Sequence, residues 1–127
     1  MLQIKLTSIM VDDQAKALAF YTDVLGFVKV MDFPAGDYRW ITVAAPGSDM
    51  QLSLEPNVNP AGKTFQAAMF AQGIPATAFE STDLAADHAR LTAAGVAFTK
   101  APTAMGPVTI AVLSDTVGNL IQLYQPL

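Results

Sequence analysis

The order of apolar and polar positions occurs twice along the chain. From Ile4 to Glu55, an apolar strand-like run precedes an amphipathic helix, which is followed by three further strand-like runs. From Pro75 to Gln125, the same order occurs again. A repeat of about 70 residues that is present only twice is too long for a solenoid and predicts a duplicated βαβββ module. We therefore expect an α+β fold in which two tandem modules form a mixed-sheet incomplete barrel around a shared cleft, with both helices outside.

Each predicted helix has a recognisable start and end. Asp13 and Asp83 are candidate N-caps, because a carboxylate accepts the free N–H groups of a first helical turn. Gly26 and Gly95 follow the helices, where glycine adopts the positive φ of a helix C-terminus without a steric penalty. The distance from aspartate to glycine is 13 positions in the first copy and 12 in the second. The helices are expected at 13–25 and 84–94.

Short apolar runs separated by turn residues predict four strands in each copy. The first run alternates only loosely, so we expect a strand that is buried largely on both faces. The connections between the later runs are rich in Pro, Gly, Asp and Ser and are short enough for hairpins. The expected strands are 2–11, 27–33, 38–45, 50–55, 76–79, 98–100, 107–113 and 120–124.

The stretch between the two copies is rich in Pro, Asn and Gly and is interpreted as a linker. Its later part, 64–70, is expected to form an irregular or short helical piece. The chain is therefore interpreted as one domain, 1–127, with a first module at 1–56, a linker at 57–73 and a second module at 74–127.

The composition narrows the classes of partner. Hydrophobic residues make up 52% of the 127 residues and charged residues only 14%, where about 25% is usual. This imbalance favours a homodimer that buries part of the apolar surface. A net charge of −4 with seven Lys and Arg argues against nucleic acid as a partner. No run is long enough to span a membrane and no signal peptide is evident, so we expect no membrane association and a cytoplasmic location.

Two motifs carry a family resemblance. The segment from Asp13 to Phe27, DQAKALAFYTDVLGF, is similar to a signature of the vicinal oxygen chelate superfamily, which includes glyoxalase I, extradiol dioxygenases and bleomycin-resistance proteins. The segment from Asp115 to Leu123, DTVGNLIQL, resembles the closing motif of that superfamily, with Thr116 where a proline is usual. The resemblance covers nearly the whole chain and implies the glyoxalase/bleomycin-resistance/dioxygenase-like fold. It does not determine the activity, because this fold hosts several chemistries.

The resemblance also implies positions for a divalent metal, held by His, Gln and Glu side chains of four strands. The first-strand positions of the two modules are Leu6 and Ala76, which cannot coordinate. In the last strands the corresponding residues are Ser53, with Glu55 two residues further on, and Gln122. Scattered oxygen donors do not make a site for Zn, Fe or Ni. We therefore expect no metal and no cofactor.

The same strands suggest a pocket for a small organic ligand. Arg39 and Trp40 are adjacent on a strand that is expected to line the cleft, and alternation would direct one of them inward and leave the other on the opposite face. Polar anchors among apolar walls are typical of small-molecule sites. The candidate ligand-binding residues are Leu6, Arg39, Trp40, Ser53, Glu55, Ala76, Gln122 and Tyr124. His88, the only histidine, lies on the apolar stripe of the second helix and is interpreted as a packing residue rather than as a general base.

Three functions remain open from the sequence. The first is a bleomycin-resistance-like protein that binds a small organic molecule without a metal, with catalytic residues unknown. The second is a metal-dependent lyase or dioxygenase, which Leu6 and Ala76 disfavour. The third is a non-catalytic dimeric accessory domain.

Overall fold

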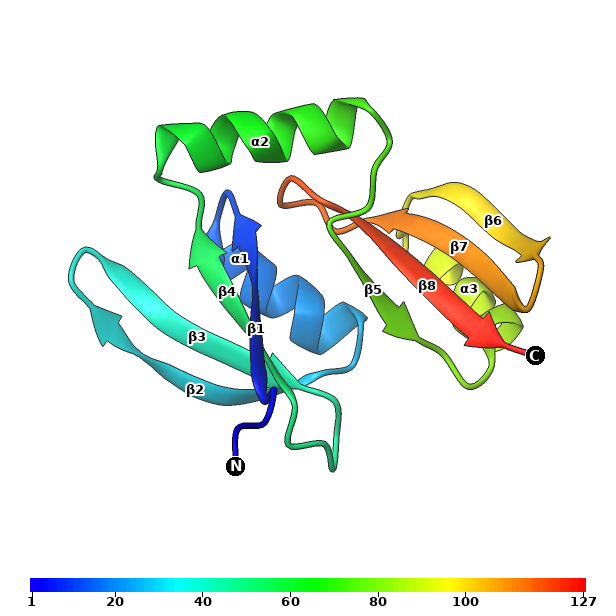
Figure 1. Ribbon diagram of the computed structural model, residues 1–127, viewed down its shortest axis with the longest axis horizontal. Helices are drawn as coiled ribbons and strands as arrows, with labels where there is room; N and C mark the ends of the chain where they lie inside the picture. Colours follow the sequence, from blue (N-terminus) through cyan, green and yellow to red (C-terminus); the bar gives the residue numbers. More distant parts are fainter. The chain divides into compact units, whose positions relative to one another are not determined.

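The computed structural model describes residues 1–127, which divide into two units, Met1–Thr64 and Phe65–Leu127 (Figure 1). Each unit is built on a four-stranded mixed sheet, and the whole chain contains three α-helices. None of these helices has the length and hydrophobicity of a membrane-spanning segment. The elements of the first unit are β1 (Leu6–Val11), α1 (Gln14–Ala19), a π-helical turn (Phe20–Val24), β2 (Val28–Ala35), β3 (Tyr38–Ala44) and β4 (Gln51–Pro56). Helix α2 (Pro60–Ala71) runs across the division, and the second unit continues with β5 (Thr77–Glu80), α3 (Leu84–Ala93), β6 (Phe98–Met105), β7 (Val108–Ser114) and β8 (Leu120–Pro126).

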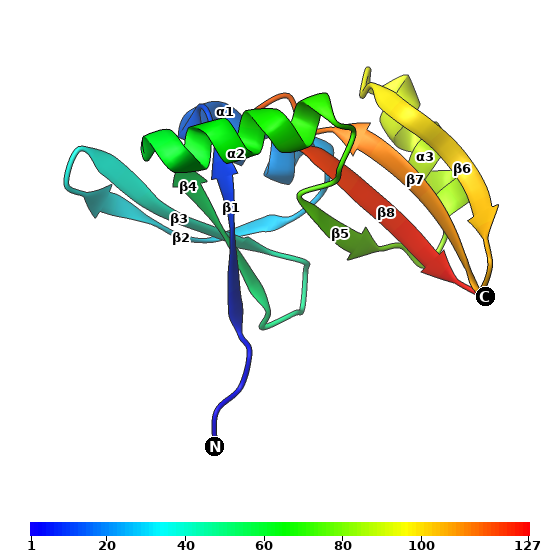
Figure 2. The ribbon, with the colours of Figure 1, turned by 45° about the horizontal axis from the view of Figure 1, so that its top comes forward.

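The two sheets have the same topology, which confirms the duplicated module. Their strand orders are β1-β4-β3-β2 and β5-β8-β7-β6 (Figure 2). In both sheets the first and last strands of the module pair in parallel, and the other neighbours pair antiparallel. Helix α1 packs on β3 and β4, and α3 packs on β6, β7 and β8. Each helix therefore covers one face of its own sheet.

The two helices begin at equivalent aspartates. Asp13 and Asp83 both have φ of −151°, and their side chains accept a hydrogen bond from the N–H groups of Lys16 and Ala86 at 3.0 Å. Gly26 and Gly95 end the helical segments with φ of +91° and +90°. A residue with a Cβ is strained in this region, so the glycines fix where each chain turns toward the next strand.

The extra residue of the first copy lies in the π-helical turn. The N–H of Leu25 bonds to the carbonyl of Phe20, five positions back, at 3.0 Å. In the second copy, the N–H of Ala94 bonds to the carbonyl of Arg90, four positions back, at 3.1 Å. An inserted residue is commonly accommodated in a helix as a single π-type turn. The difference between 13 and 12 positions, already visible in the sequence, thus has a direct structural counterpart.

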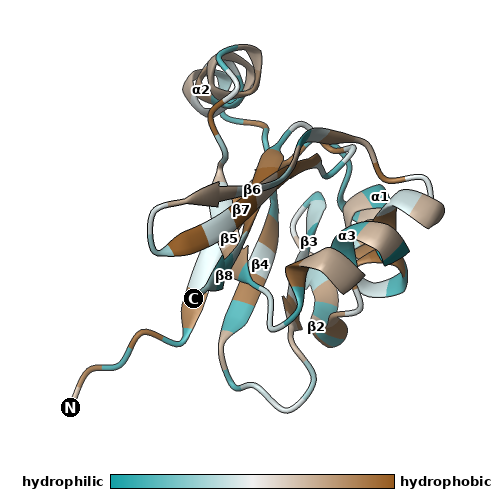
Figure 3. Ribbon diagram, turned by 90° about the vertical axis from the view of Figure 1, so that its right-hand side faces the viewer, coloured by the Kyte–Doolittle hydropathy of each residue, from teal (hydrophilic) through white to brown (hydrophobic).

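The cores form where the helices meet the sheets. In the first unit, Tyr21 of the π-helical turn is completely buried, and in the second unit Leu91 of α3, at the equivalent position of the repeat, is 2% exposed. Figure 3 shows the apolar colouring along much of β7. The buried apolar strand residues are Ile9, Val11, Ile41, Val43, Ala44, Leu52 and Leu54 in the first unit and Ile110, Ala111, Val112, Leu113, Leu120, Ile121 and Leu123 in the second, where both faces of β7 contribute.

The expectation for the first strand was wrong. Strand β1 begins at Leu6, and Leu2 and Ile4 before it are exposed, at 99% and 82% of their surface. Because β1 is the edge of its sheet, it pairs only with β4 and is not buried on both faces. The loose alternation of this run reflected an exposed apolar segment rather than a central strand.

Helix α2 is longer than the short piece expected at 64–70. It begins at Pro60, where the side chain of Asn59 accepts a hydrogen bond from the N–H of Ala61 at 3.0 Å. Proline is well suited to a first helical position, because its missing N–H would have no partner there and its φ already fits the helix. Asn59 and Pro60, which we interpreted as part of a linker, are therefore the start signal of a helix.

The loop between β7 and β8 is held by a buried carboxylate. Asp115 accepts hydrogen bonds from the N–H groups of Val117 and Asn119 at 3.0 and 2.9 Å, and from the side-chain amide of Asn119 at 2.8 Å. The buried side chain of Gln66 on α2 donates to the carbonyl of Val117 at 3.3 Å. Thr116 in this loop has φ of +67°. Proline, which is usual here in the family signature, has φ fixed near −65° and cannot adopt this conformation.

Replacing Thr116 with glycine should stabilise the protein. A β-branched residue at positive φ is strained by about 1–2 kcal/mol, and glycine removes the strain at a smaller entropic penalty. We expect the free energy of unfolding, measured by urea denaturation, to rise by about 0.5–1 kcal/mol. Thr99→Gly on the exposed part of β6 is the matched control and should lower it. A loss of stability in Thr116→Gly would contradict the strain argument.

Candidate functional site

Alternation along the strands gives each sheet one face toward its helix and one face away from it, which we call the distal face. In the first unit, the cross-strand pairs Ser8–Ser53 and Thr42–Ser53 place these three residues on the same face. The apolar residues packed toward α1 alternate with them, so this is the distal face. The residues of the distal face of the first unit include Leu6, Ser8, Met10, Met31, Phe33, Tyr38, Trp40, Thr42, Gln51, Ser53 and Glu55.

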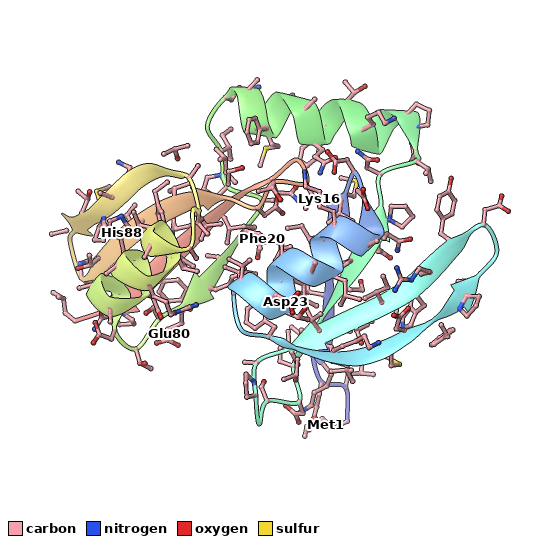
Figure 4. The ribbon with its side chains drawn as sticks, turned by 180° about the vertical axis from the view of Figure 1, so that it is seen from behind. Met1, Lys16, Phe20, Asp23, Glu80 and His88 are labelled. Carbon is pink, nitrogen blue, oxygen red and sulfur yellow. The ribbon has the colours of Figure 1, made fainter.

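The distal face of the second unit follows from the same reasoning. Gln122 pairs with Ala78 on one side and with Val112 on the other, and Tyr124 pairs with Glu80 and Ile110. Figure 4 labels Glu80 on β5. Ala76 lies two residues before Ala78, and its N–H bonds to the carbonyl of Leu120 at 2.8 Å. The residues of this face include Ala76, Ala78, Glu80, Ile110, Val112, Leu120, Gln122 and Tyr124.

The structure separates Arg39 from the other candidate residues. Arg39 lies at a position of the face toward α1. Its guanidinium forms a bidentate salt bridge with Asp32, in which Nε donates to Oδ1 at 3.1 Å and Nη2 donates to Oδ2 at 2.6 Å. The hydrogen bonds from Arg39 hold the pKa of Asp32 below its ordinary value. Trp40, the next residue, lies on the distal face with Leu6, Ser53 and Glu55. The alternative left open by the sequence is thus resolved geometrically, with Trp40 on the distal face and Arg39 on the opposite one.

The positions that hold a metal in related enzymes do not fit one here. The side chains of Leu6 and Ala76 contain only carbon and hydrogen and cannot coordinate a metal. The hydroxyl of Ser53 donates a hydrogen bond to the carbonyl of Thr7 at 3.4 Å. No group of three or more His, Cys, Asp and Glu residues is arranged to hold a metal ion. The donor set is therefore unsuitable for a transition metal, which needs three or four nitrogen, sulfur or oxygen ligands around one point.

Two polar atoms of the first distal face are buried without a hydrogen-bond partner. They are the hydroxyl of Thr42, a residue that is 0% exposed, and the side-chain carbonyl of Gln51. A buried polar group without a partner destabilises the fold by about 1–3 kcal/mol, so native proteins contain few of them. In the second unit the equivalents of Thr42 and Gln51 are the apolar Val112 and Leu120, both buried. The first distal face thus has buried polar atoms without a partner at two positions where the second has apolar side chains.

Gln14 of α1 replaces part of the ladder between β3 and β4. The two strands pair at Thr42–Ser53 and Val43–Leu52. Beyond these pairs, the Gln14 amide donates to the carbonyls of Arg39 and Leu54 at 2.6 and 2.9 Å and accepts from the N–H of Arg39 at 3.1 Å. One helical side chain therefore satisfies backbone groups of both strands where they separate.

The second unit has no such separation. Strands β7 and β8 pair continuously from Val108–Pro126 to Ser114–Leu120. The residue equivalent to Gln14 is Leu84, which is buried. The hairpin of β2 and β3 is consequently less firmly joined to its sheet than the hairpin of β6 and β7.

His88 is a packing residue, as the sequence indicated. Its ring meets the ring of Phe98 edge-on, with a centroid distance of 4.6 Å, between α3 and β6 (Figure 4). This places it on the covered side of the second sheet, away from the distal face. It is therefore not available as a general base for a molecule on the distal face.

Sequence reasoning missed three residues of interest. Glu80 was overlooked because the strand was expected to end at Phe79, although its pairing with Tyr124 puts a carboxylate on the distal face. Gln14 gave no signal, because a glutamine in a first helical turn resembles an ordinary surface residue. Thr42 could have been found from its place in the repeat, where its counterpart is Val112.

The sequence is similar to those of known proteins from one family. The chain belongs to the glyoxalase/bleomycin resistance protein/dioxygenase superfamily, whose family model matches residues 3–123. It is 50% identical over 126 residues to the protein YurT of Bacillus subtilis, covering 98% of this chain and 99% of that one.

Two solved structures have similar folds. UcmS2 matches with a TM-score of 0.85 and 28% identity over 98% of both chains. TnmS3, an antibiotic-binding protein from Streptomyces sp. CB03234, matches with a TM-score of 0.79 and 30% identity, covering 100% of this chain and 98% of that one.

Replacing Gln14 with leucine, the residue of the second copy, should destabilise the first unit. The change removes three hydrogen bonds from partly buried backbone groups, so we expect the free energy of unfolding to fall by about 2–4 kcal/mol in urea denaturation. Gln72→Leu, at an exposed position after α2, makes the same chemical change and should alter it by less than about 0.5 kcal/mol. Equal stabilities of the two variants would mean that β3 and β4 close onto each other without the glutamine.

Proposed function

We propose that this protein binds a small organic molecule without a catalytic metal, through residues of its distal faces. The observation that carries the proposal is the combination of Leu6 and Ala76, which provide only carbon at the metal-ligand positions, with nearby polar groups on the same faces. Glu55 shares a face with Leu6, and Gln122 and Tyr124 share a face with Ala76. Apolar surface with a few polar groups is the usual make-up of a small-molecule site.

Two further observations support this function. The partnerless hydroxyl of Thr42 and carbonyl of Gln51 are groups that a ligand or an ordered water could satisfy. TnmS3, which shares 30% identity with this chain over nearly the full length of both, is named as an antibiotic-binding protein. A metal-dependent lyase or dioxygenase is less well supported, because the required ligands are missing.

A thermal-shift screen of small organic molecules and divalent metals tests the proposal. A ligand at 100 times its dissociation constant should add about 2.7 kcal/mol to the stability of the folded state, and we expect organic hits but none among Zn, Ni, Fe and Mn. Ala76→Trp should weaken a hit at least tenfold, since the indole would cover the distal face of β5. Ala89→Trp on the exposed side of α3 is the matched control and should leave the affinity unchanged.

Three results would contradict the proposal. Stoichiometric metal retained through purification and lost on Gln122→Ala would favour the metal-dependent enzyme. A broad screen without any organic hit would favour the accessory domain. An organic hit that binds Ala76→Trp as tightly as the unchanged protein would remove the distal face of β5 from the site.

We also propose that the protein is a homodimer. The support is the low charge of the chain together with the exposed apolar residues Leu2 and Ile4 before the edge strand β1. We expect light scattering at micromolar concentration to give twice the 13.4 kDa of one chain. Ile4→Asp should weaken the association and Gln3→Asp should not, because only the first places a charge on a buried apolar contact. A mass of one chain at this concentration would contradict the dimer.

A further inference from the structure

The hairpin of β2 and β3 extends beyond the part of its sheet to which it is paired. Its tip projects away from β1 and β4 (Figures 1 and 2). Strand β3 pairs with β4 only at Thr42–Ser53 and Val43–Leu52. Residues 32–40, which lie beyond these pairs, include no buried residue, whereas the rest of β3 is buried. Because few packing contacts hold them, we expect these residues to have low local stability. We call residues 32–40 the flap.

The flap is firmly held together within itself. Its two strands pair without interruption from Asp32 to Ala35, and the bidentate salt bridge between Asp32 and Arg39 joins them as well. At its base, β2 has a register shift at Val30, at the same level as the last pairs of β3 with β4. A bulge bends its strand and interrupts the ladder. Both strands of the hairpin are therefore irregular at the base of the flap, and the flap itself moves as one body.

A proline explains why the ladder between β3 and β4 stops. The N–H groups of Gln51 and Asn57 bond to carbonyls on the side of β1, so the even-numbered residues between them direct their backbone groups toward β3. Continuing the register of the two observed pairs would bring Arg39 opposite Pro56. Proline has no N–H and could not donate to the carbonyl of Arg39. The amide of Gln14 fills this place and exchanges two hydrogen bonds with the backbone of Arg39, as a residue of a strand would.

The second copy places its glutamine at the other of these two positions. Leu84 is the equivalent of Gln14, and Gln125 is the equivalent of Pro56. Gln125 pairs with Thr109 within the ladder of β7 and β8, and its side chain accepts a hydrogen bond from the N–H of Leu84 at 2.8 Å. A glutamine thus links the start of the helix to the last strand in both copies. In the first copy it comes from the helix and replaces the ladder, and in the second it comes from the strand and leaves the ladder intact.

We propose that the flap swings about its base at Val30 and Thr42, and that Gln14 is the latch that holds it. Release of the latch has a low energetic penalty, because the freed glutamine is hydrated and regains its conformational freedom. Helix α1 lies on the opposite side from the distal face and blocks motion toward itself, so the flap moves toward the distal face. The motion goes beyond the proposed function, since it requires no ligand. It changes how far the first distal face is open to solvent.

Distances between two spin labels measure the motion. The chain has no cysteine, so labels can be attached at Ala15→Cys/Asp37→Cys, between α1 and the tip of the flap, and at the equivalent Ala85→Cys/Pro107→Cys of the second copy. All four residues are exposed. Labelled chains are refolded with an excess of unlabelled chains, so that only distances within one chain contribute. In pulsed electron paramagnetic resonance, we expect the distance distribution of the first pair to be at least twice as broad as that of the second.

Transfer of the second arrangement into the first copy tests the latch. Gln14→Leu/Pro56→Gln restores the missing N–H and should narrow the first distribution to the width of the second. Gln14→Ala, which releases the flap without restoring the ladder, should broaden the distribution further. Gln72→Leu, at an exposed position after α2, is the matched control and should leave both distributions unchanged.

Amide hydrogen exchange gives a second measurement on the unchanged protein, which decides the question if the double variant does not fold. The N–H of Arg39, bonded to Gln14, should exchange at least tenfold faster than the N–H of Thr109 at the equivalent position. Equal exchange rates, or equal widths of the two distance distributions, would overturn the flap. A double variant that folds and keeps the broad distribution would overturn the latch. The proposed function is tested separately by the ligand screen.

Discussion

The burial of one sheet face under a single short helix is the constraint on which the remainder of each unit depends. In each unit the helix packs on one sheet face and buries its apolar residues, among them Ile9, Val43 and Leu54 in the first unit and Ala111, Leu113 and Ile121 in the second. The aspartate caps and terminal glycines keep each helix in register with the sheet that it covers. The opposite face of each sheet does not pack on its helix, yet Thr42 and Ser53 in the first unit and Val112 and Leu120 in the second are buried there as well.

The two copies differ in the regularity of their strand pairing and in the composition of their distal faces. The second is regular: β7 and β8 pair along their whole length, and Val112, Leu120 and Ile110 make its distal face largely aliphatic beside Gln122 and Tyr124. The first is less regular. The side chain of Gln14 replaces part of the hydrogen bonding between β3 and β4, and polar atoms of Thr42 and Gln51 have no hydrogen-bond partner. Such local conflicts reduce stability, and in folded proteins they concentrate where function requires them. Because the module is duplicated, each irregular position of the first copy has a regular counterpart in the second.

Much of the fold could be predicted from the sequence, because local signals agreed with the repeat. Asp13 and Asp83, and Gly26 and Gly95, stand at matching places and mark the helices by known capping chemistry. The orientation of Arg39 and Trp40 could not be predicted, since alternation states that neighbours face opposite sides but not which side the helix covers. Gln14 was beyond prediction for another reason: its role depends on the separation of two strands that lie 25 and 40 residues away in sequence. The residues of the distal faces could not be predicted either, because they follow from the pairing of strands that are far apart in the sequence.

The π-helical turn has a consequence for how this chain can change in length. In an α-helix each added residue rotates everything beyond it by about 100°, which would turn buried side chains toward solvent. Here the N–H of Phe27 reaches back to the carbonyl of Tyr21 at 3.0 Å, just as the N–H of Val96 reaches the carbonyl of Leu91 at 3.0 Å, although one more residue lies between them in the first copy. The added residue is confined to a single widened turn, and both ends of the helical segment keep their orientation. The difference of one residue is offset in the strand that follows, since β6 has two register shifts against β7 where β2 has one against β3. The two hairpins therefore regain equivalent positions, and a change in the length of the helical segment is coupled to a bulge in the neighbouring strand.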